Sequence, residues 1–163
     1  MVTVFVSVGS NIERERSLRL GLAALQSCFG DLKCSSIYQS RAVGFTGEDF
    51  FNMVLSFETA LPVNEVAATL REIEQRHGRV RNCAKFSPRT LDLDILLYGD
   101  EVLHEQGMDI PRAEIEINAH VLQPLAELAP QLRHPLVGIT YQQLWAQFNA
   151  PEQQLWVVPF NWG

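Results

Sequence analysis

Residues 91–98 read LDLDILLY, a run of apolar residues interrupted by two aspartates at alternate positions. Its length and its apolar content are typical of a buried strand, and the turn residues Gly-Asp follow it. In a strand, residues two apart point to the same face. We therefore expect the side chains of Asp92 and Asp94 to project together. The residues that alternate with them are expected to point into a core on the other side: Leu91, Leu93 and Ile95.

Hydrophobic periodicity predicts further elements on both sides of this strand. Before it we expect a strand at 2–8, a helix at about 14–29, strands at 32–39 and 51–59, and a helix at about 61–77. The order strand-helix-strand-strand-helix-strand predicts an α+β fold with a ferredoxin-like antiparallel sheet and helices packed on it. After it we expect a short hairpin, additional C-terminal helices and a last strand, at 101–110, 111–120, 122–128, 140–148 and 155–159.

Length and composition limit the classes of protein to which the chain could belong. The chain has 163 residues, of which 47% are hydrophobic and 20% are charged, as in globular proteins. We expect residues 1–163 to form a single domain. The 13 basic and 19 acidic residues give a net charge of −6, which argues against general nucleic-acid binding. Three cysteines without a Cys-x-x-Cys motif, no signal-peptide pattern and no membrane-length apolar run predict a cytoplasmic protein without membrane contact.

The paired aspartates need a cation if both are to stay ionised in a partly buried place. Mg²⁺ is a natural candidate, because it prefers one or two carboxylates together with substrate phosphate oxygens. The preceding segment supplies local positive charge that suits a polyphosphate: Arg79, Arg81, Lys85 and Arg89. Two other interpretations stay open, namely that the aspartates lie on a solvated sheet face or that they only pair with arginines.

The stretch GRVRNCAKFSPRTLDLDILLYGD, residues 78–100, resembles the signature region of the 6-hydroxymethyl-7,8-dihydropterin pyrophosphokinase family. The resemblance continues over most of the chain, in the segments VFVSVGSN, SSIYQS, FFNMVLSFET, EQRHGRVR and VLQPLAELAPQL. It implies an enzyme of folate biosynthesis, a transferase that moves diphosphate from ATP to the hydroxymethyl group of the pterin and releases AMP. The implied ligands are the pterin, ATP as co-substrate and two Mg²⁺ ions, and we expect a monomer or a weak dimer.

The resemblance also implies roles for individual residues. Asp92 and Asp94 match the metal-binding aspartates, and together with Arg79 and Arg89 they match the catalytic set. Nucleotide contacts are implied at Glu74, Arg81, Ile95 and Arg112. Pterin contacts are implied at Ser40, Val43, Gly44, Phe50, Asn52, Phe86 and His120.

The chain departs from the family pattern mainly on the nucleotide side. Where family members commonly have a histidine and an aromatic residue, this chain has Arg112 and Ala113. Two commonly found arginines are replaced by Gly107 and Asn118, and the second stacking phenylalanine is replaced by His120. These departures leave two alternatives: a divergent paralogue that acts on another pterin or nucleotide, and a non-catalytic module that binds such a ligand.

Overall fold

The computed structural model describes residues 1–41, 49–77, 91–105 and 107–160. Its helices are α1 (Arg14–Phe29), α2 (Val63–Arg76), α3 (Glu114–Ile117), α4 (Ala119–Leu128) and α5 (Tyr141–Gln147). Its strands are β1 (Val2–Ser10), β2 (Lys33–Cys34), β3 (Ile37–Ser40), β4 (Phe50–Thr59), β5 (Asp92–Tyr98), β6 (Leu103–Glu105), β7 (Met108–Ile110) and β8 (Leu155–Val158).

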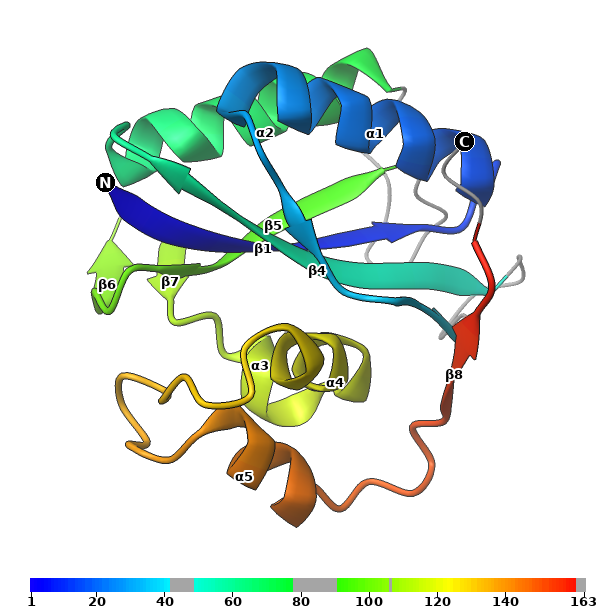
Figure 1. The fold of residues 1–163 in the computed structure, drawn as a ribbon, viewed down its shortest axis with the longest axis vertical. Coiled ribbons are helices and arrows are strands. Elements are labelled where there is room, and N and C mark those ends of the chain that lie inside the picture. The colour runs from blue at the N-terminus through cyan, green and yellow to red at the C-terminus, as the bar shows by residue number, and fades with distance from the viewer. Residues whose placement is uncertain (42–48, 78–90, 106, 161–163) are drawn as a thin grey trace.

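The main sheet has the strand order β5-β1-β4-β3-β8, and β2 also pairs with β4. Every pairing in it is antiparallel. The first four strands of this order, with α1 and α2, reproduce the predicted ferredoxin-like arrangement. Figure 1 shows α1 and α2 over one face of the sheet and α3, α4 and α5 over the other. The prediction of an α+β fold with additional C-terminal helices is therefore confirmed.

Helices on both faces explain why β4 is buried without alternation. In β4 all residues from Phe51 to Phe57 are buried, as expected of a strand covered on both sides. Met53 and Leu55 contribute to the core under α1 and α2. Val54 belongs to the second core, under α3, α4 and α5. None of the described helices has the length and apolar content needed to cross a bilayer.

The strand predicted over 32–39 is two short strands, because Ser35 interrupts it. The backbone N–H of Ser35 donates to the carbonyl of Val54 at 2.9 Å. Its hydroxyl accepts a hydrogen bond from the N–H of Val54 at 3.0 Å. A side chain thus replaces one ladder bond, and the chain bends without leaving a buried backbone group unpaired.

A bulge in β5 ties the sheet to the C-terminal helices. Phe5 lies opposite Leu97 and Val6 lies opposite Ile95, so Leu96 has no opposite residue in β1. The carbonyl of Leu96 accepts a hydrogen bond from the N–H of Arg112 at 3.0 Å. The bulge therefore anchors the segment that leads into α3, as bulges near functional sites often do.

Candidate active site

Three adjacent strands place polar residues in one row on the face that carries α3, α4 and α5. Gly9 in β1 lies opposite Asn52 in β4 and, on its other side, opposite Asp92 in β5. Directly opposite residues share a face of the sheet. A Cβ added at Gly9 would lie 3.4 Å from Oδ1 of Asn52 and 3.9 Å from Cδ1 of Phe50. The glycine therefore leaves open space between the amide and the first aspartate.

The paired aspartates point as the sequence predicted. Asp92 and Asp94 are half-buried, and the apolar residues that alternate with them, among them Leu93, lie in the core under α1 and α2. Burial and the neighbouring charge of Asp92 raise the pKa of Asp94 to about 7, while the charge of Arg112 opposes the shift. Without a bound cation, the pair thus resists carrying two negative charges near neutral pH.

Arg112 connects Asp94 to a third carboxylate. Its Nη2 lies 2.8 Å from Oε1 of Glu114 and 3.6 Å from Oδ1 of Asp94. Its Nε donates a second hydrogen bond to the same oxygen of Glu114 at 2.9 Å. The two bonds to Glu114 fix the guanidinium beside Asp94, since a planar fork held at two points has little freedom to turn. Sequence reasoning missed Glu114, because its contact depends on how α3 docks.

Glu74 reaches the site from α2. Its side chain is buried, with 3% exposed, and its Oε2 accepts a hydrogen bond from the N–H of Leu93 at 2.8 Å. Leu93 lies between the two aspartates on β5, which is an edge strand of the sheet. The Glu74 carboxylate therefore accepts a hydrogen bond from a backbone N–H that would otherwise lie unpaired at the edge of the sheet. The role implied for Glu74 in nucleotide binding stays a prediction.

Three of the residues assigned to the pterin lie together at the ends of β3 and β4. Nδ2 of Asn52 donates a hydrogen bond to Oγ of Ser40 at 2.8 Å. Ser40 lies opposite Phe50 in the ladder. Asn52 is 6% exposed, and its Oδ1 faces the open position at Gly9. The arrangement offers a fixed amide oxygen beside an aromatic ring, which suits a planar heterocycle with paired donors and acceptors.

His120, the second residue of α4, lies on the side of the site that carries the aspartates. Burial lowers the pKa of His120, and the negative charges of Glu114 and Asp92 partly oppose this shift. The ring is therefore held in its neutral form at pH 7. A neutral imidazole is able to stack on a heterocycle, as the resemblance implies for this position.

A cavity of about 250 Å³ lies between α2, β5 and β7. Ile95 and Leu70 form part of its apolar wall, and Asp94 and Arg112 lie at its polar end. The structure thus brings together two of the predicted nucleotide contacts, Ile95 and Arg112. Six other predicted site residues fall outside the described residues: Val43, Gly44, Arg79, Arg81, Phe86 and Arg89.

The candidate metal site consists of few protein ligands. Within the described residues, no group of three or more His, Cys, Asp or Glu side chains is arranged to hold a metal ion. The donor set offered there is the carboxylate pair of Asp92 and Asp94. Such a set fits Mg²⁺, which takes the rest of its oxygen ligands from phosphates and water.

Comparison with known proteins identifies the family of the chain. Residues 5–130 match the family model described as 7,8-dihydro-6-hydroxymethylpterin-pyrophosphokinase (HPPK). The chain belongs to this family. The resemblance noted from the sequence is thereby confirmed.

Three bacterial relatives of the chain are each named 2-amino-4-hydroxy-6-hydroxymethyldihydropteridine pyrophosphokinase. The protein from Synechocystis sp. is 42% identical over 118 residues, which are 72% of this chain and 60% of that protein. The protein from Aquifex aeolicus is 33% identical over 138 residues, 83% of this chain and 86% of that protein. The protein from Bacillus subtilis is 35% identical over 157 residues, 91% of this chain and 93% of that protein.

Solved HPPK structures share the fold. A structure described as HPPK-DHPS in complex with substrates matches with a TM-score of 0.69 and 12% identity, over 89% of this chain and 43% of that chain. The wild-type HPPK-DHPS of Plasmodium falciparum with SDX-DHP matches with a TM-score of 0.69 and 12% identity, over 90% of this chain and 43% of that chain. The chain therefore spans less than half the length of these matched chains, and at this identity the likeness concerns the fold.

Proposed function

We propose that this HPPK family member transfers the terminal diphosphate of ATP to the hydroxymethyl group of 6-hydroxymethyl-7,8-dihydropterin, a step of folate biosynthesis. The observation that carries the proposal is the row Asn52, Gly9 and Asp92. It puts an amide suited to the ring and a carboxylate suited to a metal-bound polyphosphate on one face, separated only by a residue without a side chain.

The pterin is held at one end of this row. The amide of Asn52, fixed by Ser40, pairs with the polar edge of the ring, and Phe50 provides one ring face for stacking. His120, which approaches from the side of Asp92, is assigned the second stacking face because the resemblance implies it. Val43, Gly44 and Phe86 complete this pocket in the proposal. The hydroxymethyl group then points along the row towards Asp92.

The nucleotide is held at the other end. Asp92 and Asp94 would hold two Mg²⁺ ions, which supply neutralisation of the phosphate oxygens when bound. Arg112 adds positive charge beside Asp94, and Ile95 offers an apolar wall for the base. Glu74 holds the strand between the aspartates. Arg79, Arg81 and Arg89 are assigned to the phosphates.

The reaction itself requires positioning and charge neutralisation more than a base. The hydroxymethyl oxygen forms a bond to the β-phosphorus. The bond from that phosphorus to the oxygen bridging towards the α-phosphate breaks, the hydroxyl proton passes to solvent, and AMP leaves. The guanidinium groups stabilise the negative charge spread over the transferring oxygens. The half-buried position of the aspartates limits water near this charge.

The test is product analysis with purified protein, ATP, Mg²⁺ and 6-hydroxymethyl-7,8-dihydropterin. We expect AMP to form in equal amount to the pterin diphosphate, and to depend on both the pterin and Mg²⁺. Asp92→Asn and Asp94→Asn are each expected to lower the turnover rate at least about a hundredfold, since metal ions supply several kcal/mol of transition-state stabilisation. Asp100→Asn, in the exposed turn after β5, is the matched control. Release of ADP in place of AMP would contradict the proposal.

The same experiment separates the alternatives. A divergent paralogue, which the resemblance suggests from Arg112 in place of a histidine, would react only with another pterin or another nucleotide. A non-catalytic module would bind pterin and ATP without forming AMP. We further propose that residues 1–163 act as a single domain and that the protein is a monomer or weak dimer in the cytoplasm. Light scattering tests the oligomeric state, and cell fractionation tests the location.

A further inference from the structure

The segment that joins α5 to β8 contacts two elements of the site, α4 and β3. Figure 1 shows this segment leading from α5 to the edge of the main sheet at β8. Gln153 lies in it, and β8 begins two residues later at Leu155. The match to the family model covers residues 5–130. The contacts of Gln153 and Leu155 therefore come from a part of the chain beyond that match.

The side-chain amide of Gln153 closes the junction between α3 and α4. Its Oε1 accepts a hydrogen bond from the N–H of Ala119 at 2.8 Å, and its Nε2 donates to the carbonyl of Ile117 at 2.9 Å. These two backbone groups flank Asn118, which is extended. The N–H of Ala119 is in the first turn of α4, where N–H groups have no partner within the helix. Since Ala119 is buried, Gln153 satisfies a donor that water reaches poorly.

The same junction sets the place of His120. This residue follows Ala119 and is the second residue of α4. Helix ends fray readily, because a side chain in the first turn has no earlier turn to hold it. Two hydrogen bonds from Gln153 fix the backbone immediately before His120. The position of the imidazole ring therefore depends on a side chain 33 residues further along the chain.

A turn holds Gln153 itself in place. The N–H of Gln153 donates to the carbonyl of Ala150 at 2.9 Å. Pro151 occupies the second position of this turn, where its fixed φ is favoured. The amide of Gln153 is thus presented from a backbone of defined conformation, which lowers the entropy cost of its two bonds.

Two residues further on, the same segment pairs with the strand that orients the amide of Asn52. Leu155 lies opposite Ser40 in the ladder of β3 and β8, and Ser40 accepts the hydrogen bond of Asn52. Two residues of chain span at most about 7 Å. The stretch from Gln153 to Leu155 therefore limits how far the start of α4 is able to move from β3.

We infer that Gln153 is a positioning residue for pterin binding: it fixes the start of α4, and with it the ring of His120, relative to the strand that orients Asn52. The inference rests on the proposed function, which assigns both residues to the pterin. Gln153 acts through the backbone of residues 117–119. Loss of its amide leaves the His120 ring free to shift, and we expect pterin binding to weaken about tenfold, as for the loss of one or two neutral hydrogen bonds.

The experiment compares Gln153→Ala with Gln154→Ala, which removes the exposed amide of the next residue. Calorimetry should show the pterin binding about tenfold more weakly to Gln153→Ala, with ATP binding as in the parent. The KM for the pterin should rise about tenfold and kcat should change less than twofold. Gln153→Met, which keeps the size of the side chain but not its hydrogen bonds, should behave like Gln153→Ala.

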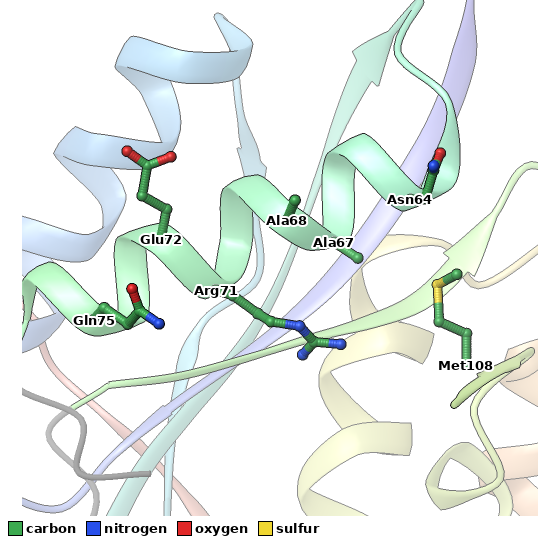
Figure 2. A pocket seen from close by; sticks show the side chains of 7 residues that line it. All are labelled: Asn64, Ala67, Ala68, Arg71, Glu72, Gln75 and Met108. Carbon is green, nitrogen blue, oxygen red and sulfur yellow. The ribbon is translucent and has the colours of Figure 1, made fainter. Parts of the chain in front are cut away.

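A second control removes an amide on the other face of the sheet. Asn64 is an exposed residue at the start of α2 and lines a cavity of about 380 Å³ along that helix (Figure 2). Asn64→Ala should bind the pterin like the parent. Thermal melts of all variants set a temperature at which each is folded, so that binding is compared between folded proteins.

A double-mutant cycle shows whether Gln153 acts through His120. Pterin affinity is measured for Gln153→Ala, His120→Ala and the double variant. Coupled residues give effects that do not add. Once the ring of His120 is gone, its position no longer matters, so Gln153→Ala should then weaken pterin binding less than twofold. A general effect on the fold would instead weaken binding by the same factor in both backgrounds.

The outcomes separate the inference from the proposed function. If the parent forms AMP but Gln153→Ala binds the pterin as Gln154→Ala does, the inference is overturned and the function stands. An equal loss with and without the His120 ring also overturns the inference, and so does a parent that binds no pterin. If the parent binds the pterin with this dependence on Gln153 and His120 yet transfers no diphosphate, the inference stands and the proposed reaction fails.

Discussion

Oε2 of Glu74 lies 2.8 Å from the backbone nitrogen of Leu93 and accepts its hydrogen bond. The bond joins the last turns of α2 to the free edge of β5, at the residue between the two aspartates. The orientation of the carboxylate pair therefore depends on a side chain that does not itself belong to the pair.

Removal of this acceptor is expected to destabilise the protein. Glu74→Ala leaves the N–H of Leu93 unpaired in a buried place, so urea unfolding should show a loss of about 2–3 kcal/mol. Glu74→Gln keeps a carbonyl oxygen at the same reach and should lose less than half as much. Glu72→Ala, on the exposed side of the same helix, is the control. Equal losses for the alanine and glutamine variants would show that the bond does not stabilise the strand.

Asp94→Asn is expected to stabilise the metal-free protein at pH 8. The raised pKa of Asp94, about 7, means that its favourable contribution to stability is present below pH ~4 and is lost as the pH rises through about 7. Above that pH, the ionised carboxyl opposes folding, and the neutral amide removes this opposition. We expect a gain of about 1–3 kcal/mol in urea unfolding with a chelator present. Parental stability in this variant, with Asp100→Asn as control, would contradict the expectation.

Asn52→Ala is expected to weaken pterin binding and leave ATP binding unchanged. The substitution removes the buried amide that Ser40 orients, and the unpaired ring edge should reduce pterin affinity by about 1–3 kcal/mol. Calorimetry with each ligand alone measures both values. Gln39→Ala is the control on the neighbouring strand, because the Gln39 side chain contacts Asp49 instead. A larger effect on ATP than on pterin would mean that the two ends of the row are assigned the wrong way round.

The buried position of His134 predicts that the protein loses stability in mild acid. It is 2% exposed, and its Nδ1 accepts hydrogen bonds from the N–H groups of Leu136 and Val137 at 3.1 and 3.3 Å. Burial lowers the pKa of His134, and the negative charge of Glu116 partly opposes this shift. The stability that neutral His134 contributes is thus present above pH ~6.5 and is lost as the pH falls from there through its folded pKa.

The measurement is the melting temperature between pH 5 and pH 8. His134→Asn places an amide oxygen near the position of Nδ1 and does not titrate, so its profile should be flatter than that of the parent. His104→Asn, at an exposed position on β6, should leave the parental slope intact. An unchanged slope in His134→Asn would assign the acid sensitivity to other groups.

The elements that the sequence predicted well are those whose pattern is local. Residues close together in the chain determine the apolar faces of α1 and α2, the apolar β4 and the alternation in β5. The order of these elements led to the correct sheet. The positions of Asp92 and Asp94 on one face also follow from spacing alone. Resemblance then supplied the roles of residues such as Asn52, which spacing does not reveal.

The errors concern features that depend on distant parts of the chain. A continuous helix was predicted over 111–120, but Asn118 is extended and separates α3 from α4. Gln153 stabilises this break from 34 residues away: its Oε1 accepts from the N–H of Ala119 and its Nε2 donates to the carbonyl of Ile117. The contact of Arg112 with Glu114 and Asp94 likewise forms only when α3 docks on the bulge of β5.

The position of Gly9 has a consequence for how this site is able to diverge. Neighbouring strands lie about 4.8 Å apart, so the ladder sets the separation of Asn52 and Asp92 in whole strand spacings. A slip by one residue would turn the whole row to the other face. Substitutions therefore cannot change the separation of Asn52 and Asp92 in small steps. The positions at which the resemblance implies departures from the family pattern all lie outside the main sheet, where no ladder fixes their spacing: Gly107, Arg112, Ala113, Asn118 and His120.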